Sequence, residues 1–350
     1  MSIELPVLRL GLAGFAAEQV AGLDAMLRRS TPGRHVWQIG HFTDSDAWWL
    51  NGARTQKVGD GTIRILPAIP TERSLQINLK EVDRPVGFSL PLTFTPAQPN
   101  YTFEPDSAAS INAVLEKFEG WLQPVAAQFS LAARIIEQES VLGTGLYHVI
   151  LNARLLAVVD MKGEIGVFPS AGPADFDDAM WVRQPEKTDV PDSFFRTSLS
   201  ELMWQYAVRT TRDVLPRRYR TGMLYFRRPP RLQQRWMSDA HMLLMRELSA
   251  AAGTFADLQQ RTGMAAPAMA KALAALYLVG TITSNPKRAT VTRTVSGREE
   301  VESSQGLQHS IVPSGLDPES VPSTQPPGMQ AGSRRRALAD FTLPMPLVRR

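Results

Sequence analysis

Residues 238–284 read SDAHMLLMRELSAAAGTFADLQQRTGMAAPAMAKALAALYLVGTITS, and this stretch carries start and stop signals for three helices. Each of three apolar runs is preceded by a residue that favours a helix N-terminus: Ser238, Thr254 and Pro267. Each run is followed by a residue that favours a helix C-terminus: Gly253, Gly263 and Gly280. Thr254 and Asp257 also have the spacing of a capping box. The pattern therefore predicts three consecutive, well-delimited helices.

Two strand-like segments follow the third helix. TITS (281–284) and ATVTRTV (289–295) flank a turn at Asn285 to Arg288, which predicts a β-hairpin. The order helix, helix, turn, helix, hairpin resembles a winged helix-turn-helix domain. We therefore expect such a domain over residues 238–292.

The winged helix resemblance implies a binding surface. In that fold the third helix enters the DNA major groove, and a basic wing contacts phosphate. The candidate DNA- or partner-binding residues are Gln259, Gln260, Arg261, Lys271, Lys287, Arg288 and Arg293. Lys271 is the only long polar side chain between Pro267 and Val279, so the third helix offers mostly alanine. DNA and a protein partner both stay open as ligands of this domain.

An arginine cluster precedes the helices. Residues 209–236 hold nine arginines against one acid, Asp213, although the whole chain has a net charge of only +4. Arginine binds phosphate in a bidentate manner, which predicts a nucleotide second messenger, such as a cyclic dinucleotide, as an alternative ligand. The phosphate-binding candidates are Arg212, Arg217, Arg218, Arg220, Arg227 and Arg228. The competing interpretation is a solvated basic strand whose arginines form salt bridges with acids elsewhere.

The arginine cluster belongs to a segment that we predict to be an α+β domain over residues 146–236. Strand-like runs at 147–152 and 155–168 include a turn at Asp160 to Gly163. An amphipathic helix is expected over 197–215, with Ser198 and Glu201 as its capping box. Another strand is expected over 219–226.

Residues 1–140 alternate between strand and helix patterns, which predicts a doubly wound α/β domain. Helices are expected at 16–29 and at 107–139, the latter broken near Pro124. Thr43 and Asp46 have capping-box spacing before AWWL, whose tryptophans we expect in the core. The expected strands are 8–14, 36–42, 62–68, 74–79 and 86–90.

In strand order and size this first domain resembles the receiver domain of bacterial response regulators. A receiver holds Mg²⁺ and phosphate with acids after its first strand, an aspartate ending its third and a lysine ending its fifth. The corresponding segments here are Gly14 to Ala17, Leu66 to Ala68 and Leu90 to Leu92, and none of them contains the required acid or lysine. The resemblance therefore implies a pseudo-receiver that is not phosphorylated in the usual way, attached to a winged helix as in transcriptional response regulators.

The sequence lacks the residue patterns that metal sites and the common enzyme active sites require. The chain has no cysteine and five histidines, none at metal-ligand spacing, and no Walker, G-x-S-x-G or G-x-G-x-x-G motif. Ser284 and Lys287 match S-x-x-K only by coincidence, and Asp175, Asp177 and Asp178 are interpreted as an exposed loop. We expect no catalytic residue, metal or cofactor.

Two further expectations concern location and the C-terminus. The chain has no long apolar run, and Glu4 lies where a signal peptide would be basic, which favours a cytoplasmic protein that does not span a membrane. Residues 296–350 are rich in Ser, Pro, Gln and Gly, which predicts a disordered tail. Together these features predict a non-enzymatic bacterial regulator that acts by macromolecular binding.

Overall fold

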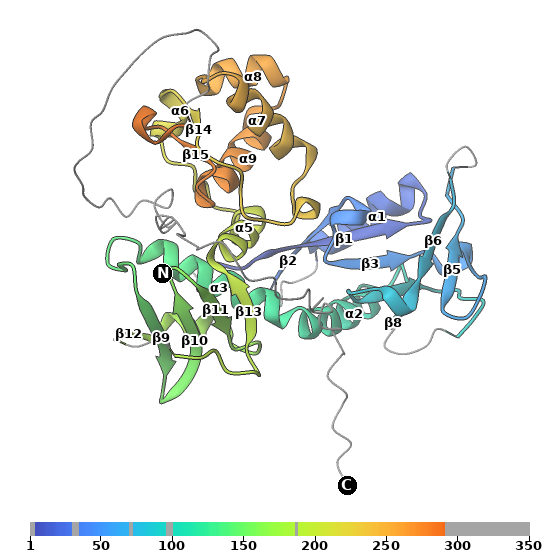
Figure 1. The fold of residues 1–350 in the computed structure, drawn as a ribbon. Helices are drawn as coiled ribbons and strands as arrows, with labels where there is room; N and C mark the ends of the chain where they lie inside the picture. Colours follow the sequence, from blue (N-terminus) through green and yellow to red (C-terminus); the bar gives the residue numbers. More distant parts are fainter. Residues whose placement is uncertain (1–3, 30–34, 70–72, 96–100, 186–187, 291–350) are drawn as a thin grey trace, which may run out of the picture.

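The computed structural model describes residues 4–29, 35–69, 73–95, 101–185 and 188–290. Figure 1 shows three parts that meet around helix α5 (Leu199–Arg209): a parallel sheet, an antiparallel sheet and a helical module. The chain is therefore a mixed α/β protein with a parallel sheet and several helices, as the sequence predicts.

The parallel sheet contains five short strands in the order β2-β1-β3-β7-β8. Every neighbouring pair in it runs parallel. The order second, first, third, fourth, fifth is one that doubly wound sheets use. The strands are β1 (Val7–Ala13), β2 (Val36–Gly40), β3 (Ala47–Leu50), β7 (Val86–Ser89) and β8 (Tyr101–Phe103).

The two faces of this sheet are covered differently. Helices α1 (Ala17–Arg29) and α2 (Ala108–Trp121) share a core with Trp49 on one face. A three-stranded antiparallel sheet, with Ile63 and Ile77 in its core, packs on Phe88 of the other face. Its strands are β4 (Thr55–Lys57), β5 (Thr62–Ile65) and β6 (Leu75–Asn78).

Two of the expected strands belong to a different sheet from the one predicted. The segments 62–68 and 74–79 do contain strands, but they pair with each other and with β4 instead of joining the parallel sheet. The third and fifth parallel strands are β3 and β8. Local antiparallel pairing needs only short turns, whereas each parallel pairing needs a crossover connection, and the sequence pattern alone does not distinguish the two.

The expected capping role of Thr43 and Asp46 is also wrong. AWWL forms the central strand β3, with Trp49 fully buried in the core as predicted. The Asp46 carboxylate accepts the backbone N–H of Arg9 at 2.8 Å, so it is not available to cap a helix. The preceding residues form the short 3₁₀ helix η1 (Phe42–Asp44); two more of the described 3₁₀ helices, η2 (Gly52–Arg54) and η3 (Leu79–Glu81), flank the small sheet.

The second part is an antiparallel sheet in the order β12-β9-β10-β11-β13. The turn at Asp160 to Gly163 joins β10 to β11 as predicted. Helix α3 (Gln123–Glu137) shares its core with Val149 and Val167 of this sheet. The remaining elements are β9 (Leu146–Leu151), β10 (Arg154–Asp160), β11 (Glu164–Val167), α4 (Pro173–Asp177), β12 (Met180–Gln184) and β13 (Phe195–Ser198).

Helix α5 begins where the capping box predicts. Glu201 N–H donates to Ser198 Oγ at 3.2 Å, and Ser198 N–H donates to Glu201 Oε2 at 3.1 Å. The helix ends at Arg209 because Thr210 has an extended backbone, so it is shorter than the expected 197–215. The strand expected over 219–226 is likewise mostly replaced, by helix α6 (Arg218–Thr221) and a two-residue strand, β14 (Tyr225–Phe226).

The third part contains the three predicted helices α7 (Asp239–Ala250), α8 (Phe255–Thr262) and α9 (Ala266–Leu278). Thr254 and Asp257 form the predicted capping box of α8, and Gly263 ends α8 in the left-handed conformation. Ser238 caps α7 together with His241. Gly253 does not end α7 directly; its backbone instead bridges to Leu224.

The strand after α9 pairs differently from the predicted hairpin. Strand β15 (Ile282–Thr283) pairs antiparallel with β14, which comes from the arginine cluster. The predicted turn contains the 3₁₀ helix η5 (Pro286–Arg288). Residues 291–295 of the second predicted strand, and the predicted tail, lie outside the described residues.

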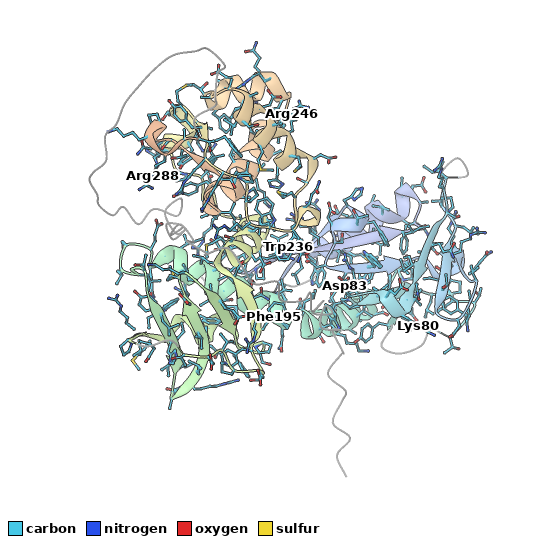
Figure 2. All side chains as sticks on the ribbon, in the orientation of Figure 1. Lys80, Asp83, Phe195, Trp236, Arg246 and Arg288 are labelled. Carbon is cyan, nitrogen blue, oxygen red and sulfur yellow. The ribbon has the colours of Figure 1, made fainter. Side chains whose placement is uncertain are left out.

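Helix α5 joins the second and third parts through one continuous core, which includes Val149 of the sheet and Leu273 of α9. Trp204 of α5 is fully buried, and its ring centroid lies 4.5 Å from that of His241 on α7. Its Nε1–H donates to the carbonyl of Trp236 in η4 (Gln234–Trp236) at 3.2 Å. Trp236 is labelled in Figure 2 at this junction. Within the described ranges, no helix combines the length and the apolar character that crossing a membrane requires.

Candidate functional site

Two basic segments that are far apart in the sequence lie together at the β14–β15 pair. The backbone N–H of Arg227 donates to Thr281 O at 2.8 Å, and the N–H of Thr290 donates to Phe226 O at 3.0 Å. These hydrogen bonds place the end of β14 beside the turn that carries Arg288. We call the resulting group the basic surface: Arg227, Arg228, Arg231, Lys287 and Arg288.

The cations of the basic surface are crowded. Burial lowers the pKa of Arg227, and the nearby charge of Arg288 lowers it further. Burial, Arg227 and Arg231 together lower the pKa of Arg228 to about 10. Arg231, Lys287 and Arg288 are exposed to solvent. Mutual repulsion of this kind is relieved by an anion, so the surface suits a ligand with several negative charges.

The sequence divided these residues between two ligands. Arg227 and Arg228 were expected to bind a nucleotide, and Lys287 and Arg288 to form a DNA-binding wing. No local pattern indicates that the two segments are adjacent, because the β14–β15 pairing joins residues of separate predicted domains. Arg293 of the predicted wing lies outside the described residues.

The third helix is not placed to read a major groove. Helix α9 is buried along most of its length, including Ala272 and Ala275, which were expected to face outward. Helix α5 packs against it, as Figure 1 shows. Lys271 is exposed, but it lines a cleft between parts of the same chain. In this arrangement Lys271 faces other parts of the chain across the cleft, and its role in binding DNA or a protein partner stays a prediction.

The second helix retains accessible polar side chains. Gln260 and Arg261 of α8 are exposed, whereas Gln259 is half-buried. Arg261 donates to the backbone carbonyl of Asp257 at 3.4 Å and lies 3.9 Å from a carboxylate oxygen of Glu247. All three residues lie in the C-terminal half of α8, and Arg261 is the one cation among them.

Several arginines of the 209–236 cluster form ion pairs within the protein. Arg209 pairs with Asp46 of the parallel-sheet part. Arg212 pairs with Glu4 at 3.0 Å and with Glu137 of α3 at 2.8 Å. Arg220 pairs with Asp213 at 2.6 Å. Arg209 and Arg212 thus form the expected salt bridges with acids elsewhere, and these pairs connect the parts of the chain, whereas Arg220 pairs with the acid of the cluster itself.

Two more arginines of the cluster are placed by α6: Arg217 is its N-cap residue, and Arg218 is its first residue, in place of the strand expected over 219–226. Tyr219 is buried with its ring centroid 4.7 Å from that of Tyr277, which excludes it as a stacking platform for a base. Arg218 lies near Glu139, whose pKa is raised to about 7 chiefly by burial.

Ligands of open parallel sheets bind at the carboxyl ends of the strands, and in this sheet two polar side chains, Asn51 and Ser89, lie at that edge. Asn51 follows β3, but its Nδ2 donates to Gly14 O at 3.0 Å and its Oδ1 accepts from Ala53 N–H at 3.1 Å. Ser89 ends β7, and its Oγ accepts from Gly52 N–H at 3.1 Å. Both side chains bond to backbone. The third parallel strand ends at Leu50 and is followed by Asn51, so the Leu66 to Ala68 segment that was compared with a receiver does not end this strand.

The acidic residues expected in an exposed loop lie on a helix instead: Asp175 and Asp177 belong to α4, and Asp178 is its C-cap residue. Asp175 accepts the N–H of Gly172 at 2.7 Å and caps α4, and Asp177 forms an ion pair with Arg134 of α3. Across the residues that the structure describes, no group of three or more His, Cys, Asp or Glu side chains is placed to hold a metal ion.

A cleft of about 580 Å³ lies where the three parts meet. Val7 and Gln38 line it from the parallel sheet, and Ala207 with residues 210–214 from the end of α5. Arg220 lines it from α6, and Ala266 to Ala274 from α9. The sequence offered one signal for this site, since Lys271 is the single charge on an otherwise apolar helix.

Comparisons with known proteins were made for the whole chain. No protein-family model matches it, and searches of the curated proteins and of the solved structures found no significant match.

Proposed function

We propose that this chain is a non-enzymatic regulatory protein whose C-terminal part acts as a winged helix module and binds nucleic acid through the basic surface. The observation that carries the proposal is the convergence of Arg227, Arg228 and Arg231 with Lys287 and Arg288. The order of α7, α8, α9 and β15 supports a module of this type.

The chemistry favours the phosphate backbone over the bases. Arginine and lysine neutralise phosphates and release condensed counterions, which is the main source of sequence-independent affinity. Helix α9 lies against α5, so base reading by this helix requires the two to separate. In the arrangement described, the proposed complex has weak sequence preference and depends strongly on salt.

The parallel-sheet part is proposed as a regulatory domain that resembles a receiver in strand order. Its first loop runs from Gly14 to Ala16, and its third parallel strand ends at Leu50 and is followed by Asn51. These residues supply no phosphoacceptor carboxylate, so regulation through this part is proposed to depend on binding. Ion pairs from α5 and the segment after it transmit any movement of the sheet to the other parts.

The proposal is tested by fluorescence anisotropy with a short labelled DNA duplex and the full chain. Replacing Lys287 and Arg288 together with alanine should weaken binding at least tenfold, because two exposed phosphate contacts are lost. Arg246→Ala is the matched control: Arg246 is exposed on α7 of the same module, and Figure 2 shows it well separated from Arg288. Equal affinity of the double variant and wild type, or no binding by wild type, overturns the proposal.

A further inference from the structure

The cleft between the three parts has the size and wall chemistry of a ligand site. Its volume of about 580 Å³ falls within the range usual for small-molecule pockets. Val7, Ala270 and Ala274 form an apolar wall, and Thr210, Thr211 and Gln38 add polar groups. The cleft is therefore able to hold a molecule with an apolar portion and a polar end.

Positive charge dominates the walls. Arg212, Arg220 and Lys271 line the cleft, and Asp213 is the only acidic residue among its lining residues within the described ranges. The three cations come from different elements: the segment after α5, helix α6 and helix α9. A cleft with low-dielectric walls concentrates the field of such charges and attracts anions.

Lys271 has no acidic partner in the described part of the chain. Burial lowers the pKa of its ammonium group, and the like charge of Arg9 lowers it further. Arg9 itself donates to Val208 O at 3.1 Å, which holds it near this wall. Two cations from β1 and α9 thus approach each other across the junction without a carboxylate beside Lys271.

Arg212 and Arg220 are held in place by acids. Glu4 and Glu137 fix Arg212, and Asp213 fixes Arg220. Such ion pairs orient the guanidinium groups in advance, so little side-chain entropy is lost when a ligand binds. At the start of α9, the Ala266 N–H is the one backbone donor of the two lining residues there, because Pro267 has none.

We propose that this cleft binds a small phosphate-bearing ligand whose anionic end lies at Lys271 and whose apolar end lies on Val7, Ala270 and Ala274. A phosphate satisfies the unpaired lysine, can accept from the Thr211 hydroxyl and has the charge to lie between Lys271 and Arg212. The site is separate from the basic surface, because none of the basic-surface residues lines the cleft. This inference does not depend on nucleic-acid binding.

Occupancy of the cleft has a structural consequence. The ligand contacts the parallel sheet, the end of α5 and α9 at once, so it stabilises the arrangement in which α9 lies against α5. A ligand that binds the assembled state and not the unfolded chain raises the melting temperature by mass action.

The test uses inorganic pyrophosphate as the probe, with the full chain, isothermal titration calorimetry and thermal melting at constant ionic strength. Wild type should bind pyrophosphate and melt at a higher temperature in its presence than in sulfate. Lys271→Met should bind at least tenfold more weakly, while Lys271→Arg, which keeps the charge, should stay within about threefold of wild type. Lys162→Met is the control, since Lys162 is an exposed lysine on the β10–β11 turn.

Three outcomes overturn the inference. These are no pyrophosphate binding by wild type, equal binding by Lys271→Met and wild type, or loss of binding in the Lys287→Ala, Arg288→Ala double variant. The last result would place the anion on the basic surface. Thermal melting of each variant without pyrophosphate shows whether the variant is folded. If Lys271→Met is not folded, Lys271→Arg provides the comparison with wild type.

Discussion

Tyr206 of α5 donates its hydroxyl hydrogen to Glu4 Oε2 at 3.0 Å, across 202 positions of the sequence. Glu4 also accepts from the hydroxyl of Thr210 and pairs with Arg212 Nε at 3.0 Å. Its side chain is only 6% exposed, so the carboxylate depends on these donors for its solvation. The segment before β1 is thereby fastened to the end of α5.

Glu4→Gln should destabilise the protein by about 1–3 kcal/mol, because the amide retains the shape of the side chain but loses the charge that three donors satisfy. Urea unfolding monitored by tryptophan fluorescence measures the change. Asp24→Asn is the control: Asp24 pairs with Arg28 on the surface of α1, and its loss should cost less than about 0.5 kcal/mol. Equal effects of the two variants would contradict the assigned role of Glu4.

Trp204→Ala should cost about 3–5 kcal/mol, since it removes a large buried side chain that packs α5 against α7. Limited proteolysis should then cleave between α5 and α7 faster than in wild type, because the hydrogen bond to Trp236 is lost as well. Trp37→Ala on the half-buried strand β2 is the comparison. An unchanged proteolysis rate would show that α5 does not hold the helical module.

His241 should make stability fall as pH decreases. Burial lowers its pKa from an ordinary 6.5 to about 4, with a further contribution from Arg9. The unfolded chain therefore binds this proton first, and stability is lost between pH 6.5 and about 4. The structure agrees, because Nδ1 accepts the N–H of Ser238 at 3.2 Å and protonation abolishes this acceptor.

His241→Gln tests this dependence, since glutamine at this position keeps an ordinary capping box with Ser238 and does not titrate. Relative to the variant, wild type should lose on the order of 2 kcal/mol between pH 6.5 and 4. Glu139, whose pKa is raised to about 7, has the opposite effect, but both proteins contain it and it cancels. Parallel stability curves for the two proteins would contradict the prediction.

Local signals predicted the helices well. The capping boxes at Ser198–Glu201 and Thr254–Asp257 form as expected, and Gly263 adopts the left-handed conformation that its position implies. These features depend on residues within four positions of each other, so the sequence contains all the information they need. The same holds for the break between α2 and α3.

The sequence alone did not predict which distant segments of the chain contact each other. AWWL became the central strand because Asp46 bonds to Arg9 and pairs with Arg209, which are distant partners. Helix α9 is buried in part by packing against α5. In the sequence, the α5 segment shows an amphipathic pattern and the α9 segment an alanine-rich one, and neither pattern indicates which helix it packs against. Four residues of the basic surface were therefore named as candidates, but not as one group: Arg227 and Arg228 were assigned to a nucleotide, and Lys287 and Arg288 to DNA or a protein partner.

The central claim is that Lys287 and Arg288, beside Arg227, bind nucleic-acid phosphates. The most direct test is the salt dependence of duplex affinity, measured from about 50 to 200 mM salt for wild type and the Lys287→Ala, Arg288→Ala variant. Each phosphate contact contributes about 0.9 to the slope of log affinity against log salt, so the variant's slope should be shallower by about 2. An unchanged slope, or a wild-type affinity that does not vary with salt, would contradict the claim.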